Sequence, residues 1–371
     1  MKKILIALLA TATVFFTLVF TLGTLSKRQN DVFQVAMVTD FSDVNDASFN
    51  QACYEGAKEW CRENNKKFNY YKPTSISLAE RIKSLKLAID RGYDVILCPG
   101  FALGEAIAEV APNHPDVTFI GLDISETDFP SGFVLPDNVI VYNYHEEIAG
   151  YLAGYAAVKD GYRKLGYLGG MEASAVIRFG YGYVQGIDAA AEELETYVEL
   201  QYVYGGQFFG DSEIYKYIDN WYKGDKADIV FACGGSIYTS VALAAKENNG
   251  YMIGVDSDQA PIIDRDYKEG ICITSAMKGI KQTVVDKLEA LYRDLNHDKG
   301  INYLGLVSSE HPEQNYVQLA LEHWRMDNFT VDDYKVLLSE IMNGTKTVSS
   351  DVSQHPETSS YTTVSYQGSI K

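Results

Sequence analysis

Basic residues are scarce in this 371-residue chain, and they are not clustered. The sequence has 32 Lys and Arg against 50 Asp and Glu, which gives a formal net charge of −18 at pH 7. Binding to nucleic-acid phosphates requires cations gathered on one face. The composition therefore predicts no nucleic-acid partner, and it is typical of a surface whose net charge keeps a protein soluble.

The sequence also lacks the spacings that metal sites and nucleophilic catalysis require. Its five cysteines form no C-x-x-C pair, and its six histidines form no H-E-x-x-H motif. No Ser-His-Asp or Cys-His arrangement can be assigned. We therefore predict no catalytic residue, no metal ligand and no cofactor.

The cysteines are expected to be buried free thiols. They lie at positions 53, 61, 98, 233 and 272. If residues 48–64 form one helix, Cys53 and Cys61 are about 12 Å apart along its axis. A disulfide requires Cα atoms within roughly 7 Å of each other. This pair is therefore not expected to bridge, and an unpaired Cys behaves as a small hydrophobic residue.

Charge is absent from a long stretch near the N-terminus, between Ile4 and Leu22. The apolar region of a signal peptide is about 7–15 residues long, and a membrane-spanning helix needs about 20. We therefore interpret residues 1–27 as a signal peptide or an N-terminal membrane anchor. Because the basic residues precede the apolar run, the positive-inside rule places Met1 in the cytoplasm and the chain after Ser26 outside.

After residue 30, apolar segments rich in β-branched residues alternate with amphipathic ones. Examples are FQVAMVT at 33–39, DVILCPG at 94–100 and VTFIGLD at 117–123, with helical periodicity in SLAERIKSLKLAIDRG at 77–92. Near-continuous apolar strands separated by amphipathic helices predict parallel sheets that are covered on both faces. The predicted class is therefore α/β and doubly wound.

Two lobes joined by a hinge are expected, because the chain exceeds one ordinary core. The first lobe is predicted to comprise residues 31–137 plus about 258–298, and the second lobe residues 138–257 plus about 299–348. The break between them is placed in SGFVLPDN at 131–138, after four strands.

Four later segments are assigned by the same pattern. The strand at 271–276 and the helix near 281–295 are expected to return to the first lobe. The segment YLGLVSSE at 303–310 and the helix around 331–342 are expected to return to the second lobe. Residues 349–371 are rich in Ser and Thr with little to bury, so a disordered tail is predicted there.

Polar, aromatic and glycine residues follow the predicted strands at the point where each one ends. In order along the chain, these residues are Asp40, Asp46, Phe49, Asn50, Asp123, Phe208, Gly234, Asp256 and Lys278. Ligands of α/β sheets bind outside the carboxyl ends of the strands. Carboxylates bind diols and amino groups, and aromatic faces stack on flat rings. The set predicts an uncharged, ringed ligand with hydroxyl groups, although any one of these residues could instead cap a helix or form a turn.

Several segments in order resemble the basic membrane protein family of bacterial solute-binding proteins, which includes PnrA-like purine nucleoside receptors of ABC importers. They include DASFNQACYEGAKEW at 46–60, FACGG at 231–235 and YMIGVDSDQ at 251–259. The resemblance spans about residues 33–348. It implies a type I periplasmic-binding-protein fold that closes on a nucleoside between its lobes.

The resemblance also implies roles for individual residues. Phe49 matches one aromatic residue that sandwiches the purine, and Phe208 matches the other, although Phe209 is adjacent. Asp40, Asn50 and Asp123 match polar groups around the base, and Asp46 belongs to the same acidic segment. Asp256 matches the carboxylate that takes the ribose hydroxyls, with Lys278 beside it and Gly234 among the backbone contacts.

The implied function is an extracytoplasmic solute-binding component of an ABC importer, which would partner the permease and ATPase subunits and contact the membrane through its N-terminal segment. A membrane-tethered sensor of the same fold, or a binder of a sugar or another small solute, is the alternative. An enzyme is not expected. A calcium-dependent nucleoside hydrolase would use Asp40, Asp43 and Asp46 for calcium, but the adjacent aspartates of those enzymes are missing.

Two features depart from the family pattern. Most members carry a lipid-modified Cys after the apolar leader, whereas no Cys precedes Cys53 here. An uncleaved helix is therefore favoured as the tether, with cleavage and release as the other outcome. The segment DFSDVND also carries Asp43 where members often have glycines, which leaves the preferred purine open.

Two further motifs have structural interpretations. Gly180, Gly182 and Gly186 in FGYGYVQG fall on a predicted helix and not directly after a strand, so close helix packing is expected instead of a dinucleotide site. His145 is expected at a helix start. Glu146 and Glu147 follow it, where carboxylates interact favourably with the helix dipole.

Overall fold

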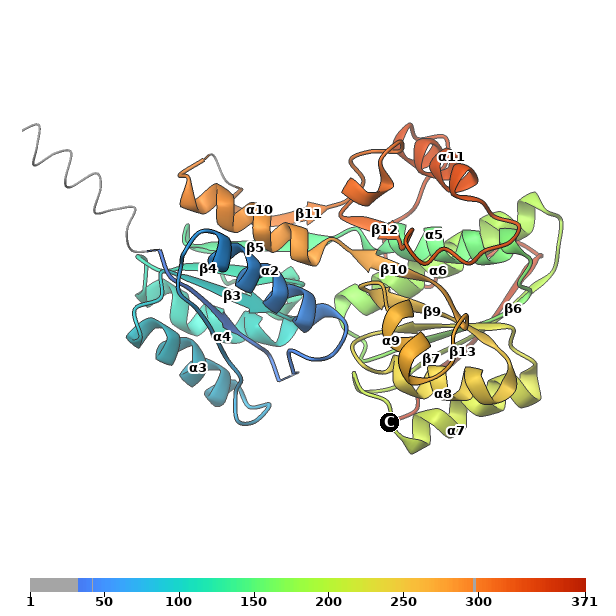
Figure 1. Cartoon of the computed structure of the whole chain (residues 1–371), viewed down its shortest axis with the longest axis horizontal. Helices are drawn as coiled ribbons and strands as arrows, with labels where there is room; N and C mark the ends of the chain where they lie inside the picture. Colours follow the sequence, from blue (N-terminus) through green and yellow to red (C-terminus); the bar gives the residue numbers. More distant parts are fainter. Residues whose placement is uncertain (1–32, 42, 296–297) are drawn as a thin grey trace, which may run out of the picture.

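The structure is a computed structural model that describes residues 33–41, 43–295 and 298–371. The predicted leader at 1–27 lies outside these residues. None of the described helices is both long enough and apolar enough to cross a membrane. The described chain forms two α/β lobes side by side, connected through the middle of the molecule (Figure 1).

The first lobe is built on a six-stranded sheet in which all neighbouring strands are parallel. Its order is β11 (Gly300–Leu304), β5 (Val139–Tyr144), β4 (Thr118–Leu122), β3 (Val95–Pro99), β1 (Val35–Val38) and β2 (Phe68–Tyr71). Helices α2 (Phe49–Glu63) and α10 (Ile280–Tyr292) cover one face, and α3 (Leu78–Asp90) and α4 (Gly104–Val110) cover the other. Along β1, Val35 and Met37 pack on the first face, and Ala36 and Val38 on the second, as the two-residue period of a strand requires.

The second lobe has a seven-stranded sheet. Its order is β12 (Val317–Leu319), β10 (Cys272–Lys278), β9 (Tyr251–Asp256), β8 (Ile229–Cys233), β6 (Lys164–Gly169), β7 (Val198–Tyr204) and β13 (Thr362–Ser369). Only the pairing of β12 with β10 is antiparallel among these described strands.

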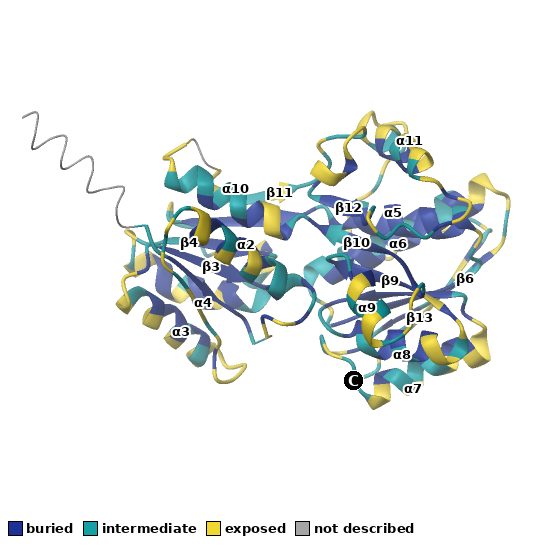
Figure 2. Cartoon of the chain, in the orientation of Figure 1, coloured by how far each residue is buried: buried dark blue, intermediate teal, exposed yellow. Residues whose placement is uncertain are grey.

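Helices cover both faces of the second sheet. Helices α5 (Glu146–Asp160), α6 (Ser174–Glu193) and α11 (Val331–Met342) share one core, and α7 (Ser212–Asn220), α8 (Tyr238–Asn248) and α9 (Ala260–Asp266) form the other. The inner strands of both sheets are largely buried, the edge strands β2, β11 and β13 are not, and further exposed residues lie on the outward faces of helices such as α3 (Figure 2). The predicted α/β, doubly wound class is confirmed.

The described part of the chain passes between the lobes three times, and the three crossings touch. The first crossing is His145, between β5 and α5; the second is Gly279, between β10 and α10; the third runs through residues 305–316 between β11 and β12. The backbone N–H of His145 donates to the Leu304 carbonyl at 2.9 Å, and that of Gly279 to the Tyr316 carbonyl at 2.8 Å. These side-by-side segments form the hinge.

Four lobe assignments made from the sequence were wrong. Helix α9 falls in the range 258–298 that was predicted for the first lobe, but it packs on the second sheet. Strand β5, which was assigned to the second lobe, completes the first sheet, so the break lies at His145 and not at 131–138. Strand β10 belongs to the second sheet and β11 to the first, the reverse of the prediction. Periodicity identifies a strand but carries no information about which of two similar sheets it joins. Helix α10 packs against α2 in the first lobe, as expected.

The predicted disordered tail is also corrected. Residues 362–369 form β13, which pairs in parallel with β7 from Thr362 opposite Val198 to Ser369 opposite Tyr204. A composition rich in Ser and Thr gives little to bury alone, but Thr362, Thr363, Val364 and Tyr366 are residues of high strand propensity when a partner edge is available. The open edge of β7 is that partner.

Helices α5 and α6 pack closely because glycines line their interface. A Cβ atom on Gly182 would lie 1.8 Å from the Glu147 carbonyl oxygen, and one on Gly150 would lie 2.0 Å from the Phe179 carbonyl oxygen. No side chain fits at either position, so the close helix packing predicted from FGYGYVQG is confirmed. This contact brings the start of α5 against α6 directly behind the gap between the lobes.

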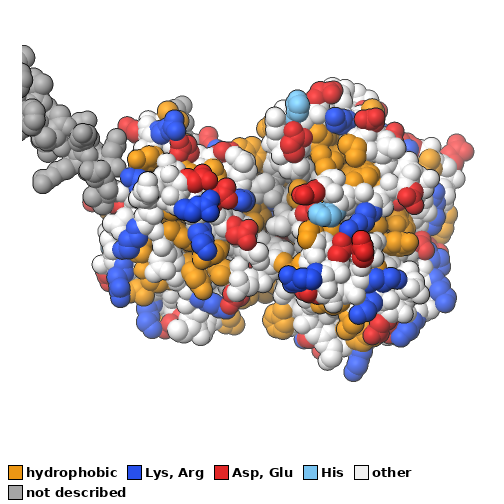
Figure 3. All heavy atoms as spheres, viewed as in Figure 1, with side chains coloured by type: hydrophobic (Ala, Val, Ile, Leu, Met, Phe, Trp, Pro, Cys, Tyr) orange, Lys and Arg blue, Asp and Glu red, His pale blue; other side chains and the backbone are white. Residues whose placement is uncertain are grey.

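All five cysteines are described, and they are buried free thiols as predicted. On the face of the molecule shown in Figure 3, acidic and basic side chains are interspersed over both lobes.

Candidate functional site

A cavity lies between the lobes at the carboxyl ends of their strands. The empty space there measures about 640 Å³, a figure that includes the part open to solvent. All nine residues named from the sequence line it, namely Asp40, Asp46, Phe49, Asn50, Asp123, Phe208, Gly234, Asp256 and Lys278. Because the carboxyl ends of parallel strands share one edge of a sheet, residues far apart in the sequence converge there.

The acidic segment before α2 is organised by Asp46. Its carboxylate accepts the backbone N–H groups of Ser48 and Gln51 at 3.0 Å each and that of Asn50 at 3.1 Å. It also accepts the side-chain amide of Asn50 at 3.2 Å. Asp46 therefore caps the helix and orients Asn50, and its oxygens are used within the protein. Burial raises the pKa of Asp46 despite these bonds.

Because Asp46 binds the amide nitrogen of Asn50, the Asn50 Oδ1 atom is the one presented to the cavity. Its Nδ2 is bound to Asp46, while its buried Oδ1 has no hydrogen-bond partner among the described residues. The Asn50 side chain is thus an oriented acceptor.

Asp40 and Gly100 sit together on the same wall. The Asp40 carboxylate accepts the backbone N–H of Phe41 at 2.6 Å. Gly100 has φ +104°, and a Cβ there would lie 2.8 Å from Asp40 Oδ2. Glycine is therefore required at position 100 both by its backbone conformation and by the Asp40 side chain.

Asp43, by contrast, lies outside the cavity. Its carboxylate pairs with Lys72 Nζ at 3.0 Å on the exposed surface. Asp40, Asp43 and Asp46 thus point to different partners, and they do not form the cluster that the hydrolase alternative needs. Over the part of the chain that the structure describes, no group of three or more His, Cys, Asp or Glu is arranged to hold a metal ion.

Two carboxylates reach the cavity from left-handed backbone conformations. Asp123 directly follows β4 with φ 54°, and Asp256 ends β9 with φ 63°. Such a conformation costs a non-glycine residue about 1–3 kcal/mol and is found preferentially at functional sites. It turns both side chains off their strands toward Lys278, at the end of β10.

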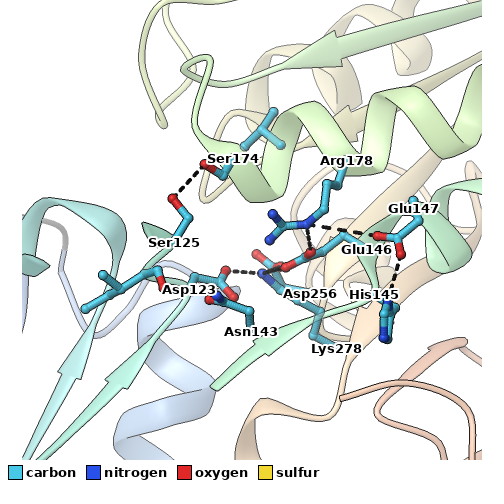
Figure 4. A network of polar contacts seen from close by, with 12 residues as sticks. Asp123, Ser125, Asn143, His145, Glu146, Glu147, Ser174, Arg178, Asp256 and Lys278 are labelled. Atoms are coloured by element: carbon cyan, nitrogen blue, oxygen red, sulfur yellow. Dashed lines mark hydrogen bonds and ion pairs between the residues drawn. The ribbon is translucent and has the colours of Figure 1, made fainter. Parts of the chain in front are cut away.

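Lys278 is the centre of this charged group (Figure 4). Its buried Nζ donates to Asp123 Oδ2, lies 3.4 Å from Asp256 Oδ1 and 3.7 Å from Glu146 Oε1. It also lies 4.8 Å from the centroid of the Phe49 ring. The ammonium group therefore joins the first lobe to the second through carboxylates from both.

Burial and the oppositely charged neighbours shift the pKa of Asp123 in opposite directions, and they do the same for the pKa of Lys278. Burial raises the pKa of Asp123 to about 7, although the Lys278 cation opposes this shift. Burial lowers the pKa of Lys278, but Asp123, Asp256 and Glu146 outweigh it and raise the pKa overall. Lys278 therefore remains charged. Asp123 also keeps one buried oxygen, Oδ1, without a partner among the described residues.

A second layer of charge lies behind Lys278 and was not predicted from the sequence. Glu146 Oε2 accepts from Arg178 Nε on α6 at 2.6 Å, and the same nitrogen lies 4.0 Å from Glu147 Oε2. Glu147 Oε1 is 2.7 Å from His145 Nδ1. The side chain of Glu146 is fully buried. Glu146 and Glu147 were interpreted only as helix-start residues. The signal for a further role is that α5 carries no other charged residue before Lys159, which is typical of a buried helix.

The two phenylalanines of GGQFFGD differ in position. The Phe208 ring lines the cavity, whereas Phe209 is 57% exposed. Phe208 lies on a floor of glycines, where a Cβ on Gly170 or Gly234 would come within 2.5 Å or 2.8 Å of its ring. Gly234 therefore also has the structural role of seating Phe208.

Further residues line the cavity; of these, Phe101 directly follows a predicted strand with Gly100, whereas the others carried no signal in the sequence. Phe101 lies with its ring centroid 6.4 Å from that of Phe208 on the opposite lobe. The segment 173–176 and Phe179 form another wall. Ser174 contacts Ser125 across the lobes, with 3.0 Å between the hydroxyl oxygens.

The comparisons with known proteins agree with this geometry. Residues 33–317 match the family described as ABC transporter substrate-binding protein PnrA-like. The chain is 31% identical over 281 residues to the ABC transporter nucleoside-binding protein BmpA of Lactococcus lactis subsp. cremoris, covering 71% of this chain and 76% of that protein. It is 27% identical over 263 residues to basic membrane protein A of Borreliella burgdorferi, covering 70% and 73%.

The fold is similar to that of a solved ABC transporter solute-binding protein from Aeropyrum pernix K1. The TM-score is 0.67 with 20% identity, covering 84% of this chain and 86% of the other. This similarity confirms the predicted periplasmic-binding-protein fold with two lobes.

Proposed function

Because the chain belongs to the family of PnrA-like ABC transporter substrate-binding proteins, as its motifs predicted, we propose that it binds purine nucleosides between its lobes and delivers them to an ABC importer. The observation that carries this proposal is the combination of aromatic rings and unpartnered acceptors in one cavity. Phe49 of the first lobe and Phe208 of the second both line it. Stacking of a base on an aromatic side chain contributes about 1–3 kcal/mol.

The acceptors suit the edge of a purine. Asn50 Oδ1 and Asp123 Oδ1 are buried and have no partner among the described residues. A buried acceptor without a hydrogen bond costs about 1–3 kcal/mol. The N–H and NH₂ groups of a base would satisfy both atoms, with Asp40 on the same side of the cavity.

The charged group at the strand ends suits a ribose. Asp256 accepts hydrogen bonds from hydroxyl groups, and Gly234 lets a ligand approach its backbone. Of the described residues that line the cavity, only Lys278 is cationic, and three carboxylates surround it. A phosphate would meet net negative charge here, so the proposed ligand is a nucleoside and not a nucleotide.

The proposal extends to partners and location. A permease and an ATPase would receive the ligand on the extracytoplasmic side of the membrane, with residues 1–27 as an anchor or a cleaved signal peptide. No chemistry on the ligand is proposed. A membrane-tethered sensor of the same fold would bind the ligand but would not stimulate a transporter ATPase, which distinguishes it from the import component.

The test is a thermal-shift panel on the full-length chain with adenosine, guanosine, inosine, uridine, ribose and galactose. A ligand present at 100 times its Kd adds about 2.7 kcal/mol to the free energy of unfolding. Purine nucleosides should raise Tm, and Asp256→Ala should abolish the rise. Asp43→Asn is the matched control, because Asp43 lies in the segment that leads to α2 but outside the cavity.

Two results would contradict the proposal. A rise in Tm with a sugar but with no nucleoside would leave the fold assignment intact and show that the ligand is a sugar. Release of free base from adenosine in the presence of calcium would indicate a hydrolase instead.

A further inference from the structure

The C-terminal segment is attached to the second lobe at several points. We call residues 345–371 the strap; it lies beyond the part of the chain that the family match covers, which ends at residue 317. The strap leaves α11 and runs over α6. Ser349 and Gln185 exchange hydrogen bonds at 2.9 Å and 3.0 Å. The Ser359 backbone N–H donates to Asp188 at 3.0 Å.

The strap then follows β7 to the end of that strand. Strand β13 pairs along β7 as far as Tyr204, and the Ile370 backbone N–H donates to the Tyr204 carbonyl at 2.8 Å. The next residues of the chain after Tyr204 form the loop 205–211, which carries Phe208 into the cavity. Residues 370–371 of the strap thus lie beside one wall of the site.

Lys371 ties the two sides of this loop together. Its Nζ donates to Gln207 Oε1 at 3.1 Å and also to Asp211 Oδ2. Gln207 Nε2 donates to the same Asp211 oxygen at 3.0 Å. Gln207 directly precedes Phe208, and Asp211 follows it by three residues. One cation therefore fixes the loop on both sides of the aromatic ring.

The C-terminal end of the loop 205–211 is already held by its contact with α7. The contact between Lys371 and Asp211 therefore restrains the loop. Asp211 Oδ1 accepts the backbone N–H groups of Glu213 and Ile214 at 2.9 Å and 3.0 Å and so caps α7. Lys371 lowers the pKa of Asp211 to about 2 together with these bonds. A Cβ on Gly206 would lie 2.9 Å from Lys371 Cβ, so the loop and the strap are in direct contact.

We propose that the strap orders the ligand site, with Lys371 as a positioning residue that holds Phe208 in its stacking position through Gln207 and Asp211. This inference rests on the proposed function, because it assigns Phe208 to the ligand. A ring that is already ordered loses less conformational freedom when the ligand binds, and affinity rises accordingly.

Closing the edge of the sheet does not account for Lys371. An unpaired edge strand is a template for aggregation, and β13 covers β7 from Thr362 onward. Ile370 and Lys371 continue past the last paired residue to reach the loop. A purely structural strap would not require a cation there.

The first experiment measures the Kd of adenosine, guanosine and inosine for the full-length chain and its variants. Lys371→Met should weaken binding about 2- to 5-fold, which is the range of a partly exposed ion pair, and Lys371→Arg should restore it. Lys346→Met is the matched control. Lys346 pairs with Glu193 at the other end of the strap, so its loss should leave Kd unchanged.

The second experiment is a double-mutant cycle with Phe208→Ala, which isolates coupling between two residues. If Lys371 acts through Phe208, Lys371→Met should have no further effect on Kd in the Phe208→Ala background. The same loss in both backgrounds would contradict a positioning role. An unchanged Kd for Lys371→Met, in a chain that binds nucleosides, would overturn the inference and leave the proposed function intact.

Hydrogen exchange without ligand separates the two proposals. The amides of residues 205–211 should exchange faster in Lys371→Met than in the wild type or in Lys346→Met. If the wild type binds no purine nucleoside, the proposed function fails, and this exchange difference still decides whether the strap orders the loop. Equal exchange rates would contradict the inference.

Discussion

Asp123 of the first lobe and Asp256 of the second lobe have the same left-handed backbone conformation. They differ in how many of their carboxylate oxygens have a partner. Both end a parallel strand with positive φ, and both contact Lys278. Asp256 Oδ2 accepts the Ser48 hydroxyl from the opposite lobe at 2.5 Å, so both of its oxygens are engaged. Asp123 keeps Oδ1 without a partner among the described residues.

This difference separates two tasks. In the proposed site, Asp256 joins the lobes and offers its carboxylate to hydroxyl groups of the ligand, while Asp123 offers a buried acceptor for which the described residues supply no donor. The segment before α2 repeats the arrangement, since Asp46 is fully used in orienting Asn50 and Asn50 Oδ1 is not. In both arrangements, groups with partners lie beside an acceptor of the first lobe that has none among the described residues.

Removing Asp256 should have the largest effect. Asp256→Ala deletes the proposed acceptor for the ribose and the partner of Ser48 and Lys278. Hydrogen bonds to charged groups contribute about 1.5–3 kcal/mol each, so nucleoside affinity should fall at least about 100-fold. Isothermal titration with inosine measures it, and a loss under tenfold would place the ribose elsewhere.

The stacking rings should come next. Phe208→Ala removes one aromatic face, which is worth about 1–3 kcal/mol, so affinity should fall about 5- to 150-fold. Phe209→Ala is the control, because Phe209 is exposed and does not line the cavity. Equal losses for both variants in the same titration would show that the loop and not the ring is responsible.

Asp123 should make binding and stability depend on pH in opposite ways. Its pKa is raised from 3.8 to about 7 in the folded protein, so between these values the folded state binds the extra proton. The contribution of Asp123 to the free energy of unfolding therefore falls as pH rises from 4 to 8. The facing charges are Lys278 on β10, Glu146 on α5 and Asp256 on β9.

The ligand is proposed to use the ionised form, so affinity should fall as pH drops below about 7. The expected limit is tenfold per pH unit for one proton. Kd and urea unfolding of the ligand-free chain between pH 5.5 and 8.5 measure both effects, and Asp123→Asn should remove both. A Kd that varies with pH in Asp123→Asn as in the wild type would assign the titration to another group.

The smallest effect is expected at the contact between the lobes. Ser48→Ala removes the donor to Asp256 and leaves a buried carboxylate oxygen without that bond. Ligand affinity should fall about 5- to 10-fold, at the lower end of the cost of about 1–3 kcal/mol for an unsatisfied buried group. Small-angle scattering of the ligand-free variant should show a more open molecule. An unchanged radius of gyration would contradict the expectation that the Ser48–Asp256 hydrogen bond holds the lobes together.

The sequence predicted the convergence of the cavity residues better than the division into lobes. Asp40, Asp123, Asp256 and Lys278 each follow a parallel strand, and the geometry of such sheets brings those ends together whatever the strand order. Strands β5, β10 and β11 were assigned to the wrong lobes because lobe membership depends on crossings at single residues such as His145 and Gly279. Nothing in hydrophobic periodicity marks those residues.

Contacts that depend on long-range packing could not be predicted from the sequence either. Arg178 lies in the middle of a helical pattern, and only the glycine-lined contact of α5 with α6 brings it to Glu146. Strand β13 depends on the free edge of β7, far away in the sequence. In both cases the local residues permit the structure, and a distant partner determines it.

The central claim is that a purine nucleoside lies between Phe49 and Phe208 with its ribose on Asp256. A crystal structure of the chain with bound inosine tests it most directly. We predict electron density for the base between the two rings, donors of the base on Asn50 Oδ1 or Asp123 Oδ1, and ribose hydroxyls within 2.5–3.0 Å of Asp256, roughly the ordinary O–H···O range. Inosine bound outside this cavity, or with its ribose between the rings, would contradict the account.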